Sequence, residues 1–83
     1  MDYVMIYNRI ATIRTERGIS RKDLADKVNV NYQTIGFIER GDYSPSLELA
    51  FDIAAALSVD IATVFSDKPF TPLFGKGDND ESA

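Results

Sequence analysis

The feature of this sequence that most constrains its fold is the run of helix start and stop signals between residues 20 and 41. Ser20, followed three positions later by Asp23, has the pattern of a capping box, in which the two side chains bond the first free N–H groups of a helix. Asn29 predicts the end of that helix, because Asn adopts the left-handed conformation of a helix stop more readily than other non-Gly residues. We therefore expect a helix over about residues 20–28.

A second helix follows almost immediately. Asn31 is a typical N-cap residue and Gly41 a typical helix stop, and together they predict a helix over about residues 31–40. Only Val30 separates the stop signal of the first helix from the start signal of the second. A connection this short forces the two helices to cross at a steep angle.

A further helix is expected ahead of this pair, over about residues 7–17. Ile6, Ile10 and Ile13 recur at helical spacing, so they can share one face of a helix. Gly18 is a typical residue for the end of that helix.

Two more helices are expected after the pair. Ser46 predicts the start of one of them, whose apolar residues form the broad stripe typical of a central, mostly buried helix. The residues of this stripe are Leu47, Ala50, Ile53, Ala54 and Leu57. Asp60 predicts the start of a short last helix that reaches about Phe65.

The composition limits the chemistry that the chain can carry. Its 83 residues are enough for one small domain and too few for two hydrophobic cores. It has no Cys and no His, and no motif arranges its Asp, Glu, Lys or Tyr residues as a catalytic group. We expect no enzyme activity, no cofactor and no metal site. No apolar run approaches the roughly 20 residues of a membrane helix, and a signal peptide is not evident, which predicts a cytoplasmic protein.

The charge is divided unevenly along the chain, although the net charge is only -4. Residues 9–40 contain seven Arg or Lys and four Asp or Glu, whereas residues 41–83 contain two Lys and eight Asp or Glu. One half can therefore face a polyanion such as nucleic acid while the other half faces water. The alternative is that the uneven distribution is an ordinary scatter of charge and has no functional meaning.

The segment LADKVNVNYQTIGFIERGDYSPSLELA resembles the Xre family of phage repressor and Cro-type regulators. It matches the family in Leu-Ala before the turn, Val after it, Gln-Thr-Ile in the next helix, Ile-Glu-x-Gly at the end of that helix, and the following Pro-Ser-Leu. The resemblance covers about residues 8–65. It implies an all-α, five-helix domain of the lambda-repressor type, over residues 1–67, that binds DNA and regulates transcription in a prokaryote or phage, located on the nucleoid when bound.

The resemblance makes residues 31–40 the recognition helix, which enters the major groove of double-stranded DNA. The residues expected on its DNA-facing side are Asn31, Tyr32, Gln33, Thr34, Gly36 and Phe37. Gln33 can form a bidentate pair with adenine, and Tyr32, Thr34 and Phe37 can contact thymine methyl groups or phosphates. For any one of these residues, the alternative to a DNA contact is that it is an ordinary solvated surface residue.

The resemblance also implies contacts outside the reading face. Arg21 is placed on a DNA phosphate, and Arg40 with Tyr43 on the backbone beyond it; such contacts position a protein without reading the sequence. Arg14 and Glu39 match a pair that links the first helix to the recognition helix in this family. A DNA contact is the alternative for that pair.

The sequence departs from the family pattern at several positions. Asn29 replaces the usual Gly of the turn, and Gly36 replaces a common Ser or Asn. Tyr32 and Asp42 stand where the family often has basic residues, which weakens the attraction to phosphate. A Gly inside a helix lowers the stability of the helix by about 1 kcal/mol relative to Ala. Two explanations of Gly36 are open: a close approach of the backbone to DNA, or a neutral substitution.

The two ends of the chain have strand-like composition: YVMIY at residues 3–7 and KPFTPLF at residues 68–74. Some small Xre-type regulators pair such ends, so we expect a short two-stranded antiparallel sheet, with residues 68–75 as the C-terminal strand and dimerisation segment and residues 76–83 as a polar tail. The residues expected in the homodimer interface are Val64, Phe65, Phe70, Leu73 and Phe74. The alternative is that they fold back on their own core as a lid.

Together these features predict a sequence-specific DNA-binding regulator, acting as a homodimeric repressor on a two-fold operator. The alternative is a protein-interaction module, such as an antitoxin or co-regulator, that uses the same helical scaffold and binds a protein through its acidic half.

Overall fold

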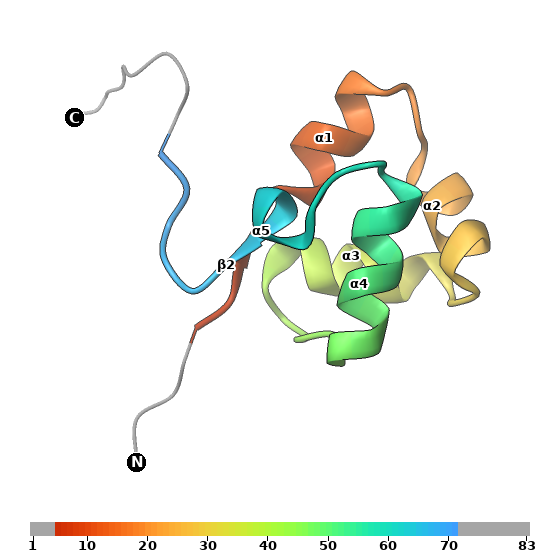
Figure 1. The fold of residues 1–83 in the computed structure, drawn as a ribbon. Helices are drawn as coiled ribbons and strands as arrows, with labels where there is room; N and C mark the ends of the chain where they lie inside the picture. The colour runs from red at the N-terminus through yellow and green to blue at the C-terminus, as the bar shows by residue number, and fades with distance from the viewer. Residues whose placement is uncertain (1–4, 72–83) are drawn as a thin grey trace.

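The computed structural model describes residues 5–71 of the chain. This part is mostly helical and carries a small antiparallel sheet, as the sequence predicts (Figure 1). The elements in chain order are β1 (Tyr7–Asn8), α1 (Ile10–Glu16), α2 (Arg21–Val28), α3 (Tyr32–Arg40), α4 (Leu47–Ala56), α5 (Ile61–Val64) and β2 (Phe65–Ser66). The two strands lie on one side of the helices, and α2 lies on the opposite side. None of the helices in the described part is long and apolar enough to cross a membrane.

The start and stop signals around α2 and α3 act as predicted. Ser20 Oγ accepts a hydrogen bond from the Asp23 N–H at 2.9 Å, and Asp23 Oδ2 accepts one from the Ser20 N–H at 3.3 Å, so both halves of the capping box form. Asn29 ends α2 in the left-handed conformation, with φ of 61°. Asn31 then caps α3 through a 2.8 Å bond from the Gln33 N–H. The short connection between the two helices is therefore hydrogen-bonded at both ends.

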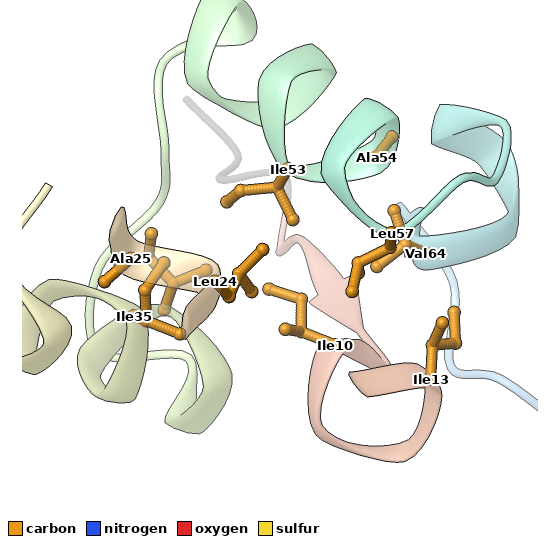
Figure 2. Close-up of a cluster of buried hydrophobic side chains, with 10 residues drawn as sticks. Ile10, Ile13, Leu24, Ala25, Ile35, Ile53, Ala54, Leu57 and Val64 are labelled. Carbon is orange, nitrogen blue, oxygen red and sulfur yellow. The ribbon is translucent and has the colours of Figure 1, made fainter. Parts of the chain in front are cut away.

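The hydrophobic core lies where α2 and α3 meet α1, α4 and α5 (Figure 2). Leu24 of α2 is fully buried at its centre, between Ile35 on one side and Ile10 on the other. The other buried apolar residues are Ile13, Ala25, Ile38, Ala50, Ile53, Ala54, Leu57 and Val64. Burying one large aliphatic side chain contributes about 1.5–3 kcal/mol, so this cluster is the main source of stability. Among residues 5–71, no polar or charged residue is buried.

The first helix begins at Ile10 and not near Tyr7 as predicted. Tyr7 and Asn8 pair instead with Ser66 and Phe65 in the antiparallel sheet. The side chain of Asn8 then accepts a bond from the Ile10 N–H at 3.1 Å, which helps to start the helix after the strand. Helical spacing of the isoleucines could not reveal that the residues before Ile10 have a strand partner.

The sheet itself is confirmed, but its C-terminal strand lies earlier than predicted. The strand is Phe65–Ser66, directly after α5, whereas we expected it within residues 68–75. Of that expected range, residues 68–71 are described and form no strand. Pro69 has no N–H to donate to a strand ladder, which favours pairing before it.

Two details of α4 and α5 also differ from expectation. Leu47 is 70% exposed and does not belong to the buried stripe of α4. It lies one helical turn before Phe51, which is 53% exposed, so both residues are on the outer face of the helix. Asp60 precedes α5 as predicted, but its side chain makes no capping hydrogen bond.

Candidate nucleic-acid interface

The outer face of α3 is rich in aromatic and uncharged polar groups. Tyr32 is 51% and Phe37 is 46% exposed, Gln33 is exposed, and Thr34 is half-buried. The isoleucines on the opposite face point into the core, so the orientation of α3 follows from its apolar period. The structure therefore brings together on one surface four of the residues predicted to face DNA.

Asn31 lies at the N-terminus of this face, but its side chain has a structural task. Its Oδ1 accepts the Gln33 N–H and its carbonyl accepts the Thr34 N–H at 2.9 Å. Asn31 thus fixes the first turn of α3. A direct contact of its side chain with DNA stays a prediction.

Glu39 anchors the C-terminal half of α3. Its Oε2 accepts a 2.9 Å bond from Arg14 Nε of α1, and its side chain is only 6% exposed. Arg14 also donates to the carbonyl of Ile19 at 3.2 Å. The predicted pair of Arg14 and Glu39, which links α1 to α3, is therefore confirmed. A largely buried ion pair of this kind resists separation, because losing one partner leaves the other charge poorly solvated.

Arg21, which we expected on a phosphate, lies at the start of α2 beside α3. Its Nε donates to Glu39 Oε1 at 3.3 Å, and its side chain is 44% exposed. Glu39 therefore holds two arginines: Arg14 donates to both carboxylate oxygens, and Arg21 donates to Oε1. The pairing of Glu39 with Arg21 was not predicted, because a single sequence gives no distance between positions 18 residues apart.

Arg40 lies at the end of α3 with its guanidinium over the ring of Phe37, 5.0 Å from the ring centre. Its Nε donates to Asp42 Oδ2 at 3.2 Å. Tyr43 is 52% exposed and joins Thr34, Phe37 and Asp42 in lining a shallow hollow of about 470 Å³. The hollow continues the exposed face of α3 toward the loop that follows it.

Gly36 is buried, so the prediction that it is exposed on the reading face is wrong. The side chains of Arg21 and Arg40 lie over it: a Cβ at this position would be 3.7 Å from Arg21 Cδ and 3.4 Å from Arg40 Nη1. The missing side chain thus leaves room for two arginines and does not form a bare patch of backbone.

The surface predicted for dimerisation is only partly present. Val64 is fully buried in the core of its own chain, so the prediction that it forms an exposed patch is wrong. Phe65 and Phe70 are half-buried. Phe70 lies against Arg9, whose guanidinium is 4.5 Å from the ring centre. Leu73 and Phe74, like the predicted tail, lie outside the described residues.

Asn8 and Arg9 are positioning residues that the sequence analysis missed. Asn8 Nδ2 donates to the carbonyl of Ile38 in α3 at 2.8 Å, and Arg9 Nε donates to the carbonyl of Thr63 in α5 at 2.7 Å. Both side chains therefore tie the region of β1 to helices far along the chain. The only sequence signal was the position of two polar residues between a strand-like and a helix-like segment.

A family model described as helix-turn-helix matches residues 10–64, from the start of α1 to the end of α5. The chain belongs to this family, of the Xre or Cro/C1 type. It is a transcriptional regulator with a helix-turn-helix DNA-binding fold and not an enzyme. The family that the sequence resembles is therefore confirmed.

The chain is similar to several proteins that are named as regulators. An HTH-type transcriptional regulator of Methanocaldococcus jannaschii is 43% identical over 58 residues, which are 70% of this chain and 88% of that protein. The immunity repressor protein of Bacillus phage phi105 is 33% identical over 60 residues, 72% of this chain and 42% of the repressor. In structure, the restriction-modification controller protein C.AhdI of Aeromonas hydrophila is similar with a TM-score of 0.63 and 28% identity, over 65% of this chain and 82% of that chain.

Proposed function

We propose that this protein is a sequence-specific repressor that binds a two-fold DNA operator as a homodimer, in the cytoplasm of a prokaryotic cell. The observation that carries the proposal is the exposed face of α3, with Tyr32, Gln33 and Phe37 on a helix that Glu39 fixes to α1. A rigidly held helix that exposes amide and aromatic side chains suits the major groove, because the groove admits one helix and presents acceptors, donors and thymine methyl groups.

The reading of bases is assigned to three side chains. Gln33 pairs with an adenine through its amide, while Tyr32 and Phe37 contact thymine methyl groups or the adjacent backbone. Arg21, Arg40 and Tyr43 contact phosphates and set the position of α3 in the groove. Replacing Gln33 by Ala is expected to cost about 1–3 kcal/mol of binding on the operator and much less on random DNA. Equal losses on both DNAs would remove Gln33 from the reading role.

The dimer is proposed to form through the side of the molecule that carries β1 and β2. Phe65 and Phe70 are half-buried there, and Leu73 and Phe74 follow them in the sequence. A two-fold dimer of this kind would place its two recognition helices about 34 Å apart, one turn of DNA. Repression follows because a bound dimer excludes polymerase without any further part.

Selection of bound sequences from a random DNA pool tests the proposal directly. The selected sites should have two-fold symmetry with half-site centres about one helical turn apart. Affinity for a selected site should also fall steeply as salt is raised, because bound arginines release counterions from the DNA. Enrichment of no sequence, together with weak binding that is the same for all DNA, would contradict the proposal.

A second candidate function is supported by the outer face of α4. Leu47 and Phe51 form an exposed apolar ridge, and Glu48 and Asp52 are exposed on the same helix, which has no basic residue. Such a face suits a protein partner with apolar and basic groups, as expected of a co-regulator or antitoxin. A photo-crosslinking residue at position 51 should then capture one defined protein in cells, and replacing Leu47 by Ser should abolish the capture while DNA binding is kept.

A further inference from the structure

The side chains of Arg21 and Arg40 converge on one point of the surface. Arg21 comes from the first turn of α2 and Arg40 from the last turn of α3. The Nη1 atoms of both lie within 3.7 Å of the position that a Cβ of Gly36 would occupy. Two arginines distant in the sequence thus each place a terminal nitrogen next to one residue that has no side chain.

Both guanidiniums are held from behind by a carboxylate. Arg21 donates through Nε to Glu39, and Arg40 donates through Nε to Asp42. Arg40 also lies over the ring of Phe37, which supports the plane of its guanidinium. Within the described residues each arginine is thus held through Nε, and no hydrogen bond is made by its Nη groups, which carry four of its five N–H donors.

Two like charges this close repel each other, and the repulsion must be offset. The carboxylates of Glu39 and Asp42 offset only part of this charge, because Glu39 also pairs with Arg14, and an anion bound beside the Nη groups would offset more of it. The side chains of Arg21 and Arg40 are 44% and 55% exposed, so a large polyanion can reach them. Arginine binds phosphate in particular, because its planar fork matches two phosphate oxygens.

We propose that Arg21 and Arg40 form a single clamp over Gly36 that binds one phosphodiester of the DNA backbone. The choice of DNA as the source of the phosphate rests on the proposed function. The family resemblance predicts contacts of the two arginines with separate parts of the DNA backbone, whereas the clamp gives them one phosphate in common. Gly36 is the residue at which a longer side chain would enter the space between them, which gives its presence in α3 a physical reason.

Neutral-phosphate scanning of a selected operator tests the shared contact. Each phosphate of one half-site is replaced in turn by an uncharged methylphosphonate, and the affinity is measured for the protein and for Arg21→Gln and Arg40→Gln. One position should weaken binding of the unmodified protein roughly tenfold, as loss of a charge-assisted contact does. Both variants should become insensitive at that same position. Insensitivity of the two variants at different positions would overturn the clamp.

Arg17→Gln is the matched control, since Arg17 is an exposed arginine just after the end of α1. It removes the same charge and should keep the sensitivity of the unmodified protein at every position. Gly36→Asp provides a third test, because it places a carboxylate between the two guanidiniums while Asp is no worse than Gly inside a helix. It should abolish sensitivity at the shared position with the fold retained, as checked by circular dichroism. Retained sensitivity in folded Gly36→Asp would contradict the clamp.

A titration without DNA separates the clamp from the proposed function. Inorganic phosphate is added at constant ionic strength, and the Nε–Hε resonances of Arg21 and Arg40 are followed by NMR. Both should shift with one dissociation constant, and Arg21→Gln should weaken the response of Arg40. Independent responses, or none, would overturn the clamp even if the protein binds DNA. If both arginines respond together but the protein selects no DNA sequence, the clamp is supported and the proposed function is wrong.

Discussion

The α2–α3 unit, residues 20–41, and the sheet of β1 and β2, which we call the ends of the described chain, are held together by different kinds of contact. In the α2–α3 unit, caps such as Ser20 with Asp23 join residues three positions apart, and the apolar faces of both helices are buried in one core. At the ends, β1 and β2 form a sheet of only two residues each. Polar bonds from Asn8 and Arg9 to Ile38 and Thr63, 30 and 54 positions away, fix this sheet to the helices.

The two regions also contribute differently to the domain. The unit that presents α3 is specified by local caps and by apolar burial. The ends add few buried apolar contacts, since Phe65 and Phe70 remain half-buried. Asn8 nevertheless connects them to the carbonyl of Ile38 in α3. The position of the sheet is therefore coupled to the C-terminal half of α3.

The largest effect is expected from Leu24→Ala, which attacks the core of the α2–α3 unit. Leu24 is fully buried, and truncating such a side chain costs about 2–5 kcal/mol through lost burial and a cavity. Chemical denaturation should report this loss in the free energy of unfolding. Leu47→Ala, at a position that is 70% exposed, should change it by less than about 0.5 kcal/mol. Similar losses for the two leucines would mean that burial does not distinguish them.

The next effect concerns Glu39, which joins the α2–α3 unit to α1. Glu39→Ala removes the acceptor of Arg14 and Arg21 and should lower the free energy of unfolding by about 1.5–3 kcal/mol, the range for hydrogen bonds to charged groups. Asp26→Ala is the control, because its pair with Lys22 is exposed and such pairs contribute at most about 1 kcal/mol. If unfolding is unchanged in Glu39→Ala while DNA affinity falls, the carboxylate serves binding and not the scaffold.

The same contrast explains what could be predicted from the sequence. The bounds of α2 and α3 and their caps follow from residues that act on neighbours within a turn, as with Ser20 and Asn29. The family resemblance added the pair of Arg14 and Glu39. The start of α1, by contrast, depends on whether Tyr7 finds a strand partner near the other end of the chain. No local pattern contains that information.

In the candidate site, too, the local features were predictable and the contacts between distant residues were not. The exposure of Tyr32, Gln33 and Phe37 follows from the apolar period of α3. Gly36 was expected to be exposed because that period ignores side chains arriving from α2 and from the last turn of α3 itself. Val64 was expected in an interface with the apolar residues that follow it, but it is the last residue of α5 and its side chain lies in the core.

Asn8→Ala tests whether the ends are held mainly by polar bonds. It removes the donor to the Ile38 carbonyl and the acceptor of the Ile10 N–H. This should lower the free energy of unfolding by about 1–3 kcal/mol, because each of the two bonds contributes about 0.5–1.5 kcal/mol. Hydrogen exchange should become faster at the start of α1 and in β1, with α2 unchanged. Gln33→Ala, on the exposed face of α3, is the control for stability and should leave both measurements unaltered. Unchanged exchange at the start of α1 would mean that Asn8 does not hold it.

The smallest effect is expected from Phe70→Leu, and it decides what the C-terminal end does. Leu keeps an apolar side chain but removes the aromatic face that lies on Arg9, so within one chain the loss should be only about 0.5–1 kcal/mol. If Phe70 also contacts a second copy, as the proposed homodimer requires, the loss must increase with protein concentration, because dimerisation stabilises the folded state by mass action. Denaturation at several protein concentrations, compared with Phe51→Leu on the outer face of α4, measures both parts. A loss that is the same at every concentration would make Phe70 a lid on its own chain and move the dimer interface elsewhere.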